Sequence, residues 1–397
     1  MTHYSITIMK AITSIKLEMA ILITFTLCTD SIKAQNNSLF NWGLSNVQEI
    51  WFANISNTSE DAEPVWLHYT DASIGYEWSI NSSWSLNVYG SAFFTNGNSI
   101  SDFVGDLQGI SNIEAHRGAE ILEGWLELIS PIGLGLKGGI LNSNGDFDSI
   151  EPAQFFINSS HGIGPDLSSV GANGPSIFPE TGLGAIAFFE EKKWSIKLGT
   201  FDPLTRASGS ELNKASNIDW DFSDGVLMVS ELQVSTTDSR ISLGIWTSSF
   251  SLEKNYTELS NLSNTKGMYT SLSRSDSFGD TYIRLGLSES KNAYIDRYVG
   301  AGWIKNISSS SNFLPKSLIG ISWASARLGD LGLFSELAGV ELNKDDHSFE
   351  HILEISSNTK LSDNLQLQPN LQFIMQPGAQ VRAQSRLVLG IRGIFEI

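Results

Sequence analysis

The chain has 397 residues, 41% of them hydrophobic and only 17% charged, with a formal net charge of −18. This acidic balance argues against nucleic acid and anionic surfaces as partners. After the first 35 residues, no stretch approaches the roughly 18 continuous apolar residues of a spanning helix, which excludes helical membrane proteins. The chain has a single cysteine, so a small disulfide-stapled domain is excluded as well.

The N-terminal segment has the order of a secretory signal peptide. Lys10 and Lys16 precede a short apolar core, Met19–Cys28, and small or polar residues follow up to Ala34. A basic region, an apolar core of about ten residues and a small-residue exit are typical of export. We therefore expect residues 1–34 to be cleaved, with a buried first helix as the alternative.

The remainder of the chain repeats one design. Segments of about ten residues with one apolar face are separated by turns rich in Gly, Asp, Asn and Ser, as in ASIGYEWSI, EILEGWLELI and SRISLGIWTSS. A period of two indicates strands, and closely spaced pairs of strands indicate antiparallel hairpins. About 16 segments fit this pattern. Amphipathic helical patterns that would cover the apolar faces are nearly absent.

These patterns predict an all-β fold, a transmembrane antiparallel up-and-down β-barrel of the porin type with about 16 strands. The apolar faces would meet lipid and the polar faces a water-filled interior. A soluble sandwich or repeat protein is the alternative, since alternation is a weak signal in any one segment. We expect an N-terminal periplasmic segment at residues 35–63 and the barrel with its loops at residues 64–397. Asn142–Pro179 and Phe201–Asp224 are too long for tight turns and are expected to be surface or infolded loops.

Near the C-terminus, NLQLQPNLQF places amides at alternate positions, opposite leucines and Phe373. In a barrel the amide face is expected to line the water-filled interior, although a merely solvated polar face would give the same pattern. The amides are Gln366, Gln368, Asn370 and Gln372. The last segment, SRLVLGIRGIFEI, alternates too, so the chain ends in a strand that would pair with the first strand of a closed barrel.

The segment GAEILEGWLELI offers chemistry for sugar recognition. Burying Glu123 and Glu127 against hydrocarbon would cost about 2 to 4 kcal/mol each at mid-depth, so both should face the lumen together with Trp125. Leu122, Gly124, Leu126 and Leu128 would then face lipid. Carboxylates bind hydroxyls, and an aromatic ring stacks on a sugar's C–H face. A tryptophan at the membrane interface is the alternative role for Trp125. Further lumen candidates by alternation are Lys137, Lys193, Lys197, Glu231, Gln233, Arg240, Arg284, Glu354, Arg386 and Arg392.

Three stretches carry a resemblance to a known family. They are VGDLQGISNIEA, FFINSSHGIGPDLSSVGANGPSIFPETGLG, and LQPNLQFIMQPGA with the terminal LVLGIRGIFEI. Over Val104–Ile397 the chain resembles the carbohydrate-selective porins (OprB-like) of bacterial outer membranes, and the likeness is weak at residues 35–103. The resemblance implies a barrel of about 16 strands and passive diffusion of neutral sugars. The chain departs from it by ending on Ile397 where the family usually ends on an aromatic residue.

We therefore expect an outer-membrane porin selective for small sugars, with no enzymatic activity, catalytic residue, metal or cofactor. Six histidines are scattered without ligand spacing, and GLGLKG continues a strand where a dinucleotide site would open a helix. The expected partners are mono- and oligosaccharides, outer-membrane lipid and the outer-membrane assembly machinery, and the porin would be a homotrimer or a monomer. A non-selective or ion-biased porin of the same fold, or a barrel enzyme or adhesin, is the alternative. Whether Asn158–Pro179 folds into the barrel is left open.

Overall fold

The computed structural model describes residues 40–54, 64–80, 84–170, 174–203, 225–250, 264–290, 293–307, 317–330, 334–335, 340–341 and 348–397. Contacts divide the chain into two compact units, Met1–Asn41 and Trp42–Ile397, and the barrel belongs to the second. The expected signal peptide, residues 1–34, lies outside the described residues, as does most of the expected loop at residues 201–224. Within the described part of the chain, no helix is long and apolar enough to cross a membrane.

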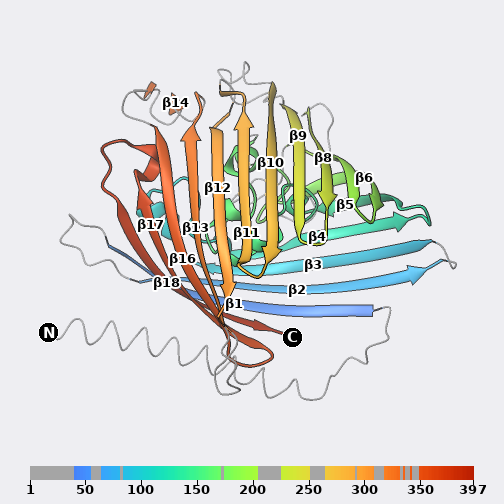
Figure 1. Ribbon diagram of the computed structural model, residues 1–397, viewed down its shortest axis with the longest axis horizontal. Coiled ribbons are helices and arrows are strands. Elements are labelled where there is room, and N and C mark those ends of the chain that lie inside the picture. The colour runs from blue at the N-terminus through green and yellow to red at the C-terminus, as the bar shows by residue number, and fades with distance from the viewer. Residues whose placement is uncertain are drawn as a thin grey trace. The chain divides into compact units, whose positions relative to one another are not determined.

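Sixteen antiparallel strands form a closed barrel, in which each strand pairs with the next along the chain and β1 closes the ring on β18. The prediction of a 16-stranded barrel is confirmed. In Figure 1, β1 to β4 run across the direction of β9 to β13, because strands on opposite walls of a tilted barrel cross. The strands are β1 (Phe40–Asn54), β2 (Val65–Ser79), β3 (Ser85–Gly97), β4 (Gly118–Ile129), β5 (Leu134–Leu141), β6 (Gly182–Glu191), β7 (Trp194–Phe201), β8 (Gly225–Ser235), β9 (Ser239–Phe250), β10 (Asn264–Asp276), β11 (Gly279–Ser288), β12 (Ile295–Asn306), β13 (Ser317–Leu328), β16 (Phe349–Lys360), β17 (Leu365–Met375) and β18 (Arg386–Glu396).

The two ends of the barrel differ. Tight turns such as those between β6 and β7 and between β10 and β11 gather at the end where β18 finishes, here called the short-turn end. The opposite, long-loop end carries the β3–β4 connection with α2 (Ile100–Val104) and the β5–β6 connection. A small sheet of β14 (Phe334–Ser335) and β15 (Val340–Glu341) lies between β13 and β16 in the chain, and η8 (Pro377–Ala379) lies between β17 and β18.

The outer face of the barrel is apolar. Leu136 on β5 is 61% exposed and Ile245 on β9 is 57% exposed, whereas Glu231 on β8, which points inward, is 6% exposed. This is the reverse of a soluble protein and matches strands that meet hydrocarbon on the outside. The expected inversion of apolar and polar faces is therefore present in the structure.

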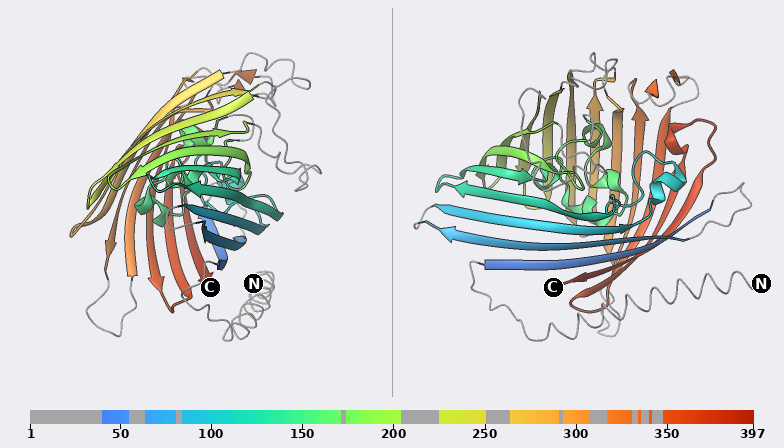
Figure 2. Two further views of the ribbon diagram at one scale, coloured as in Figure 1. Left: turned by 90° about the vertical axis from the view of Figure 1, so that its right-hand side faces the viewer. Right: turned by 180° about the vertical axis from the view of Figure 1, so that it is seen from behind.

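The interior is only partly polar, because two long loops fill part of it. The β3–β4 connection contributes Ile100, Val104 and Ile110 to an apolar cluster against β1 and β16 to β18. The β5–β6 connection contributes Phe147 and Leu167 to a second cluster against β6 to β10. Figure 2 shows the short helices of these connections within the ring of strands. The expectation that the inward faces of the strands meet a water-filled interior is wrong where these loops pack.

Two sequence expectations require correction. Residues 35–63 were expected to be periplasmic, but Phe40–Asn54 form β1 and pair with β18 from Ser45 to Asn54. Leu122 was expected to face lipid, but it is only 8% exposed. The pairing of β3 with β4 shifts register between Ser91 and Ala92, so Leu122 is the extra residue of a bulge and leaves the outer face.

Candidate functional site

The β5–β6 connection, residues 142–181, folds into the barrel and is here called the infolded loop. Its described residues include four short helices: η2 (Ser143–Gly145), η3 (Glu151–Phe155), η4 (Ser159–His161) and α3 (Pro165–Ser168). Such short helices leave most of their backbone carbonyls without partners inside the helix, so donors must come from elsewhere. The barrel wall supplies them.

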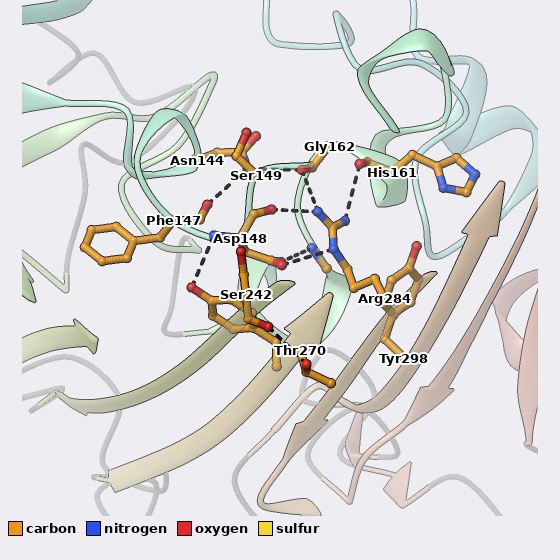
Figure 3. Close-up of polar contacts among 12 residues, drawn as sticks. Asn144, Phe147, Asp148, Ser149, His161, Gly162, Ser242, Thr270, Arg284 and Tyr298 are labelled. Carbon is orange, nitrogen blue, oxygen red and sulfur yellow. Dashed lines mark hydrogen bonds and ion pairs between the residues drawn. The ribbon is translucent and has the colours of Figure 1, made fainter. Parts of the chain in front are cut away.

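Arg284 on β11 is the main anchor of the infolded loop. Its guanidinium is 1% exposed and donates to the backbone oxygens of Asp148 at 2.6 Å and of Gly162 at 3.2 Å. It donates also to the backbone oxygens of Ser160 and His161, at 3.2 and 3.3 Å. Its Nε lies 3.0 Å from the Asp148 carboxylate. Figure 3 shows the loop carbonyls converging on this side chain. Arg284 therefore fixes the loop and does not line a water-filled passage.

Strands β16 and β17 hold the loop farther round the barrel wall. The Glu354 carboxylate accepts the backbone N–H groups of Ile157 at 2.8 Å and Asn158 at 3.1 Å. Gln372 accepts from the Asn158 amide at 3.1 Å, and Gln368 donates to the Phe155 carbonyl at 2.7 Å. All four inward side chains, Glu354, Gln368, Asn370 and Gln372, are at most 4% exposed. The amides of β17 point inward, but Gln368 and Gln372 bind the loop and Asn370 binds Glu354 and Ser356 of β16, so the expectation that these three line water is wrong.

The β3–β4 connection is held in the same manner by β1 and β18. Arg392 forms an ion pair with Glu49 at 2.5 Å. Glu49 also accepts from Ser111 at 2.8 Å, and Arg392 donates to Asn112 at 2.5 Å. Both loop residues belong to the β3–β4 connection, so this ion pair joins the closing strands of the barrel to that loop.

An aromatic and charged wall faces the other side of the infolded loop. Tyr89 and Trp125 stack with ring centroids 5.2 Å apart, and the Lys137 ammonium lies 4.2 Å from the Trp125 ring. Trp125 donates to Glu123 at 3.2 Å, and Asn87 donates to Glu127 at 2.8 Å. The residues Asn87, Tyr89, Glu123, Trp125, Glu127 and Lys137 are here called the aromatic–charged strip.

Asp146 of the infolded loop joins the strip to the loop. Its carboxylate lies 2.9 Å from the Lys137 ammonium and 3.5 Å from that of Lys197 on β7. The side chains of the strip are partly buried and none is fully enclosed. Rings, carboxylates and an ammonium group in this arrangement suit a solute that has both hydroxyls and flat C–H faces.

Comparison with known proteins decides the family. The model of the OprB family, carbohydrate-selective porins, matches residues 85–396. The chain belongs to this family. Its function is the family's carbohydrate-selective passage, its place is the outer membrane, and the resemblance found in the sequence is confirmed. No curated protein matches the chain.

Solved porins share the fold of this OprB-family protein. The high-pH structure of Pseudomonas putida OprB is 14% identical, with 90% of this chain and 94% of that chain covered, and the TM-score is 0.73. Salmonella typhi OmpF in complex with daunomycin is 8% identical, with 90% and 97% covered and a TM-score of 0.57. The trimer form of Vibrio cholerae OmpT is 10% identical, with 90% and 99% covered and a TM-score of 0.53.

The structure of this OprB-family porin separates the sequence candidates into groups. Glu123, Trp125, Glu127 and Lys137 lie together in the strip, with Lys197 beside them through Asp146. Glu231 is buried and accepts from the Tyr269 hydroxyl at 2.7 Å. Arg284, Glu354 and Arg392 anchor loops. Gln233 and the exposed Arg240 point inward near the short-turn end, where Gln366 also lies, and half-buried Arg386 points inward at the long-loop end. Lys193 was expected in the lumen, but it lies exposed in the tight turn after β6.

Sequence reasoning missed several residues of this region. Asp146 and Asp148 lie in a loop, where no alternation assigns a direction. Tyr89 and Asn87 are on β3, where they pair with Trp125 and Glu127 of β4. Aligning the two strands of this hairpin would have identified both residues. Glu49 was missed because its segment was assigned to the periplasm.

The infolded loop carries two buried groups that resist ionisation. Asp166 is 1% exposed, and neither of its carboxylate oxygens has a hydrogen-bond partner in the described structure. Burial, with the nearby charge of Asp148, raises the pKa of Asp166 to about 8. Burial and the nearby Arg284 charge lower the pKa of His161 to about 3. Its ring nitrogens lie 2.8 Å from the hydroxyls of Tyr282 and Ser322, which fix a neutral ring.

These shifts predict opposite pH effects on the folded loop. The folded state keeps a proton on Asp166 that the unfolded chain loses near pH 4, so Asp166 lowers stability as pH rises toward about 8. His161 resists the proton that the unfolded chain takes up, so it lowers stability as pH falls from 6.5 toward about 3. Asp166→Asn should therefore remove part of the loss in unfolding temperature between pH 6 and pH 9. Unfolding is measured by gel electrophoresis of samples heated to graded temperatures without boiling, in which folded and unfolded barrels migrate differently. Asp363→Asn, at an exposed position, is the control. Equal alkaline losses in wild type and Asp166→Asn would contradict the assignment.

Proposed function

We propose that small neutral sugars cross this porin by passive diffusion between the infolded loop and the aromatic–charged strip, with no covalent step. The proposal is supported by the family of the chain and by the strip itself, where stacked rings lie among carboxylates and an ammonium group. A diffusing solute needs contacts strong enough to favour entry and weak enough to allow release. Partly buried rings and hydrogen-bonding groups on one wall provide contacts of that kind.

The charges of the strip favour neutral solutes. Lys137 and Lys197 are both paired with Asp146, so neither is an uncompensated cation that would hold an anion. Trp125 lies between Glu123 and Lys137, so a sugar ring stacked on the indole has acceptors and donors at its edge. A zwitterion of equal size would have to give up more hydration at the same wall.

Trp125→Ala tests this pathway. An aromatic contact of about 0.5 to 1.5 kcal/mol would change binding roughly 2- to 10-fold, so glucose uptake should slow by a factor in that range. Proteoliposome swelling in glucose measures the rate. Trp194→Ala, which removes a tryptophan 43% exposed on the outer face, is the matched control and should leave the rate unchanged. Equal swelling rates of the wild type in glucose and in a zwitterion of the same size would remove the selectivity.

One pair of residues resembles an enzyme's nucleophile and base. The Ser322 hydroxyl lies 2.8 Å from His161 Nε2, a distance at which a base activates a nucleophile. Ser322 is 2% exposed and His161 is 1% exposed, and the other ring nitrogen of His161 is bonded to Tyr282. No substrate reaches such a pair without unfolding the loop. Ser322→Ala should therefore leave sugar passage unchanged, and any loss of a hydrolytic activity in this variant would restore the enzyme alternative.

In the outer membrane, the short-turn end would face the periplasm and the long loops the exterior. This proposal includes two further steps. Signal cleavage removes residues 1–34, and the assembly machinery recognises the C-terminal strand. The outer face of β18 supports the second point, since Leu387, Leu389 and Ile391 form an exposed apolar row.

A further inference from the structure

A cavity lies at the short-turn end, on the wall opposite the residues of the strip. It has a volume of about 410 Å³ and lies between η3 of the infolded loop and the inner surface of β9 to β13. We propose that this cavity, here called the exit vestibule, binds a neutral monosaccharide that has passed the infolded loop. The inference rests on the proposed function for its choice of ligand.

The floor of the exit vestibule is apolar and fixed. Phe155 and Pro152 come from η3, and Ile304 and Leu318 come from β12 and β13. The Phe155 ring packs edge-on against Phe156 with centroids 5.2 Å apart, and the Phe155 carbonyl is bonded to Gln368. A partly exposed ring held in this way matches the C–H face of a pyranose.

The rim of the exit vestibule carries unused hydrogen-bonding groups. Arg240 shares its strand face with the buried Ser242, so it points inward, and it is exposed to the cavity. In the described part of the chain, the side chains of Arg240 and Glu151 have no ion-pair or hydrogen-bond partner, whereas Arg284 and Arg392 are both paired. Ser273 and Asp280 complete the polar side. These donors and acceptors remain available to a ligand.

The size and charge of the exit vestibule select the ligand class. Its volume lies at the lower end of the roughly 300 to 1,000 Å³ of small-molecule sites. Charges of both signs face it, from Arg240 on one side and from Glu151 and Asp280 on the other, so a single-sign ion meets repulsion as well as attraction. A solute with many hydroxyls and no charge can use donors and acceptors together with the Phe155 ring. A monosaccharide has that chemistry.

Glucose added to one side of single channels in a planar bilayer tests the proposal. Glucose on the short-turn side should reach the exit vestibule without crossing the infolded loop and should reduce the current in a saturable manner. Arg240→Ala and Glu151→Gln should each raise the half-blocking glucose concentration from that side by about tenfold, as expected for a lost hydrogen bond to a charged group. Lys193→Ala in the turn after β6 and Glu191→Gln at the end of β6 change the same charges outside the cavity and should have no effect. Lys192→Cys, labelled from one side, identifies the short-turn side.

The outcomes separate this proposal from the proposed function. An Arg240-dependent block from the short-turn side supports the exit vestibule, even if swelling shows no glucose uptake, in which case the proposed function alone fails. Unchanged half-blocking concentrations in Arg240→Ala and Glu151→Gln overturn the exit vestibule, even if glucose passes freely. A loss of block that is equal from both sides also overturns it, because the change would then lie at the infolded loop. Unchanged conductance without sugar shows that each variant keeps the channel.

Discussion

Replacing Arg284 by methionine is expected to release the infolded loop from the barrel wall and to raise the single-channel conductance. The substitution removes a buried ion pair and four hydrogen bonds to loop carbonyls, three of them buried and the one to Gly162 partly buried. It also leaves the Asp148 carboxylate without its cation. Removing one partner of a buried ion pair costs about 3 to 5 kcal/mol, which is enough to depopulate the infolded state. Conductance should rise, and swelling should extend to larger sugars.

Three further variants serve as controls for the effect of Arg284→Met on conductance and stability. Arg284→Lys keeps the charge and loses the planar fork, so its conductance should lie between those of the wild type and Arg284→Met. The double variant Arg284→Met with Asp148→Asn removes both charges and should recover part of the lost stability. Arg274→Met on the neighbouring strand removes an arginine that is 57% exposed and should change stability by less than about 1 kcal/mol. An Arg284→Met barrel with unchanged conductance and sugar range would show that the loop is held elsewhere.

The barrel could be predicted because its signal is local. Strand alternation depends on residues two apart, and the cost of placing carboxylates in hydrocarbon assigns a direction, as it did for Glu123 and Glu127. The first strand escaped this reasoning because Asn46 and Gln48 interrupt its outer face, which otherwise carries the exposed Phe40, Trp42 and Phe52. Asn46 donates to Thr70 at 2.7 Å, and Trp66 donates to Gln48 at 3.0 Å, so neighbouring strands satisfy these groups. The alternation of residue types along one strand does not show these hydrogen bonds between neighbouring strands.

The candidate site was harder to predict, because alternation gives the direction of a side chain but not what lies opposite. Gln368 and Gln372 point inward as their pattern requires, yet they meet loop backbone that is more than 200 residues away in the chain. Arg284 and Asp148 are 136 positions apart, and Asp148 lies in a segment without periodicity. The sequence thus identified inward-pointing groups, and only the folded loop shows which of them remain accessible to solute.

Replacing Asp146 by asparagine is expected to shift the porin toward anions. Asp146 is the partner of both Lys137 and Lys197, at 2.9 and 3.5 Å, and the three side chains are 11 to 18% exposed. Without the carboxylate, two ammonium groups lose their ion-pair partner beside the passage. An anion about 4 Å from one such charge gains about 1 kcal/mol even in bulk water, or roughly a fivefold preference. The reversal potential in a KCl gradient should move accordingly, with glucose uptake changing much less.

The controls for Asp146→Asn separate the effect of the local charge on the reversal potential from the effect of the net charge. Glu191→Gln removes one exposed negative charge from the end of β6, at the short-turn end, and should leave the reversal potential unchanged. Adding Lys137→Met to Asp146→Asn removes one of the two freed cations and should return the potential part of the way. An unchanged reversal potential in Asp146→Asn would mean that ions pass elsewhere. Because sugars and ions would share one passage, that result would also place the sugar pathway away from the strip.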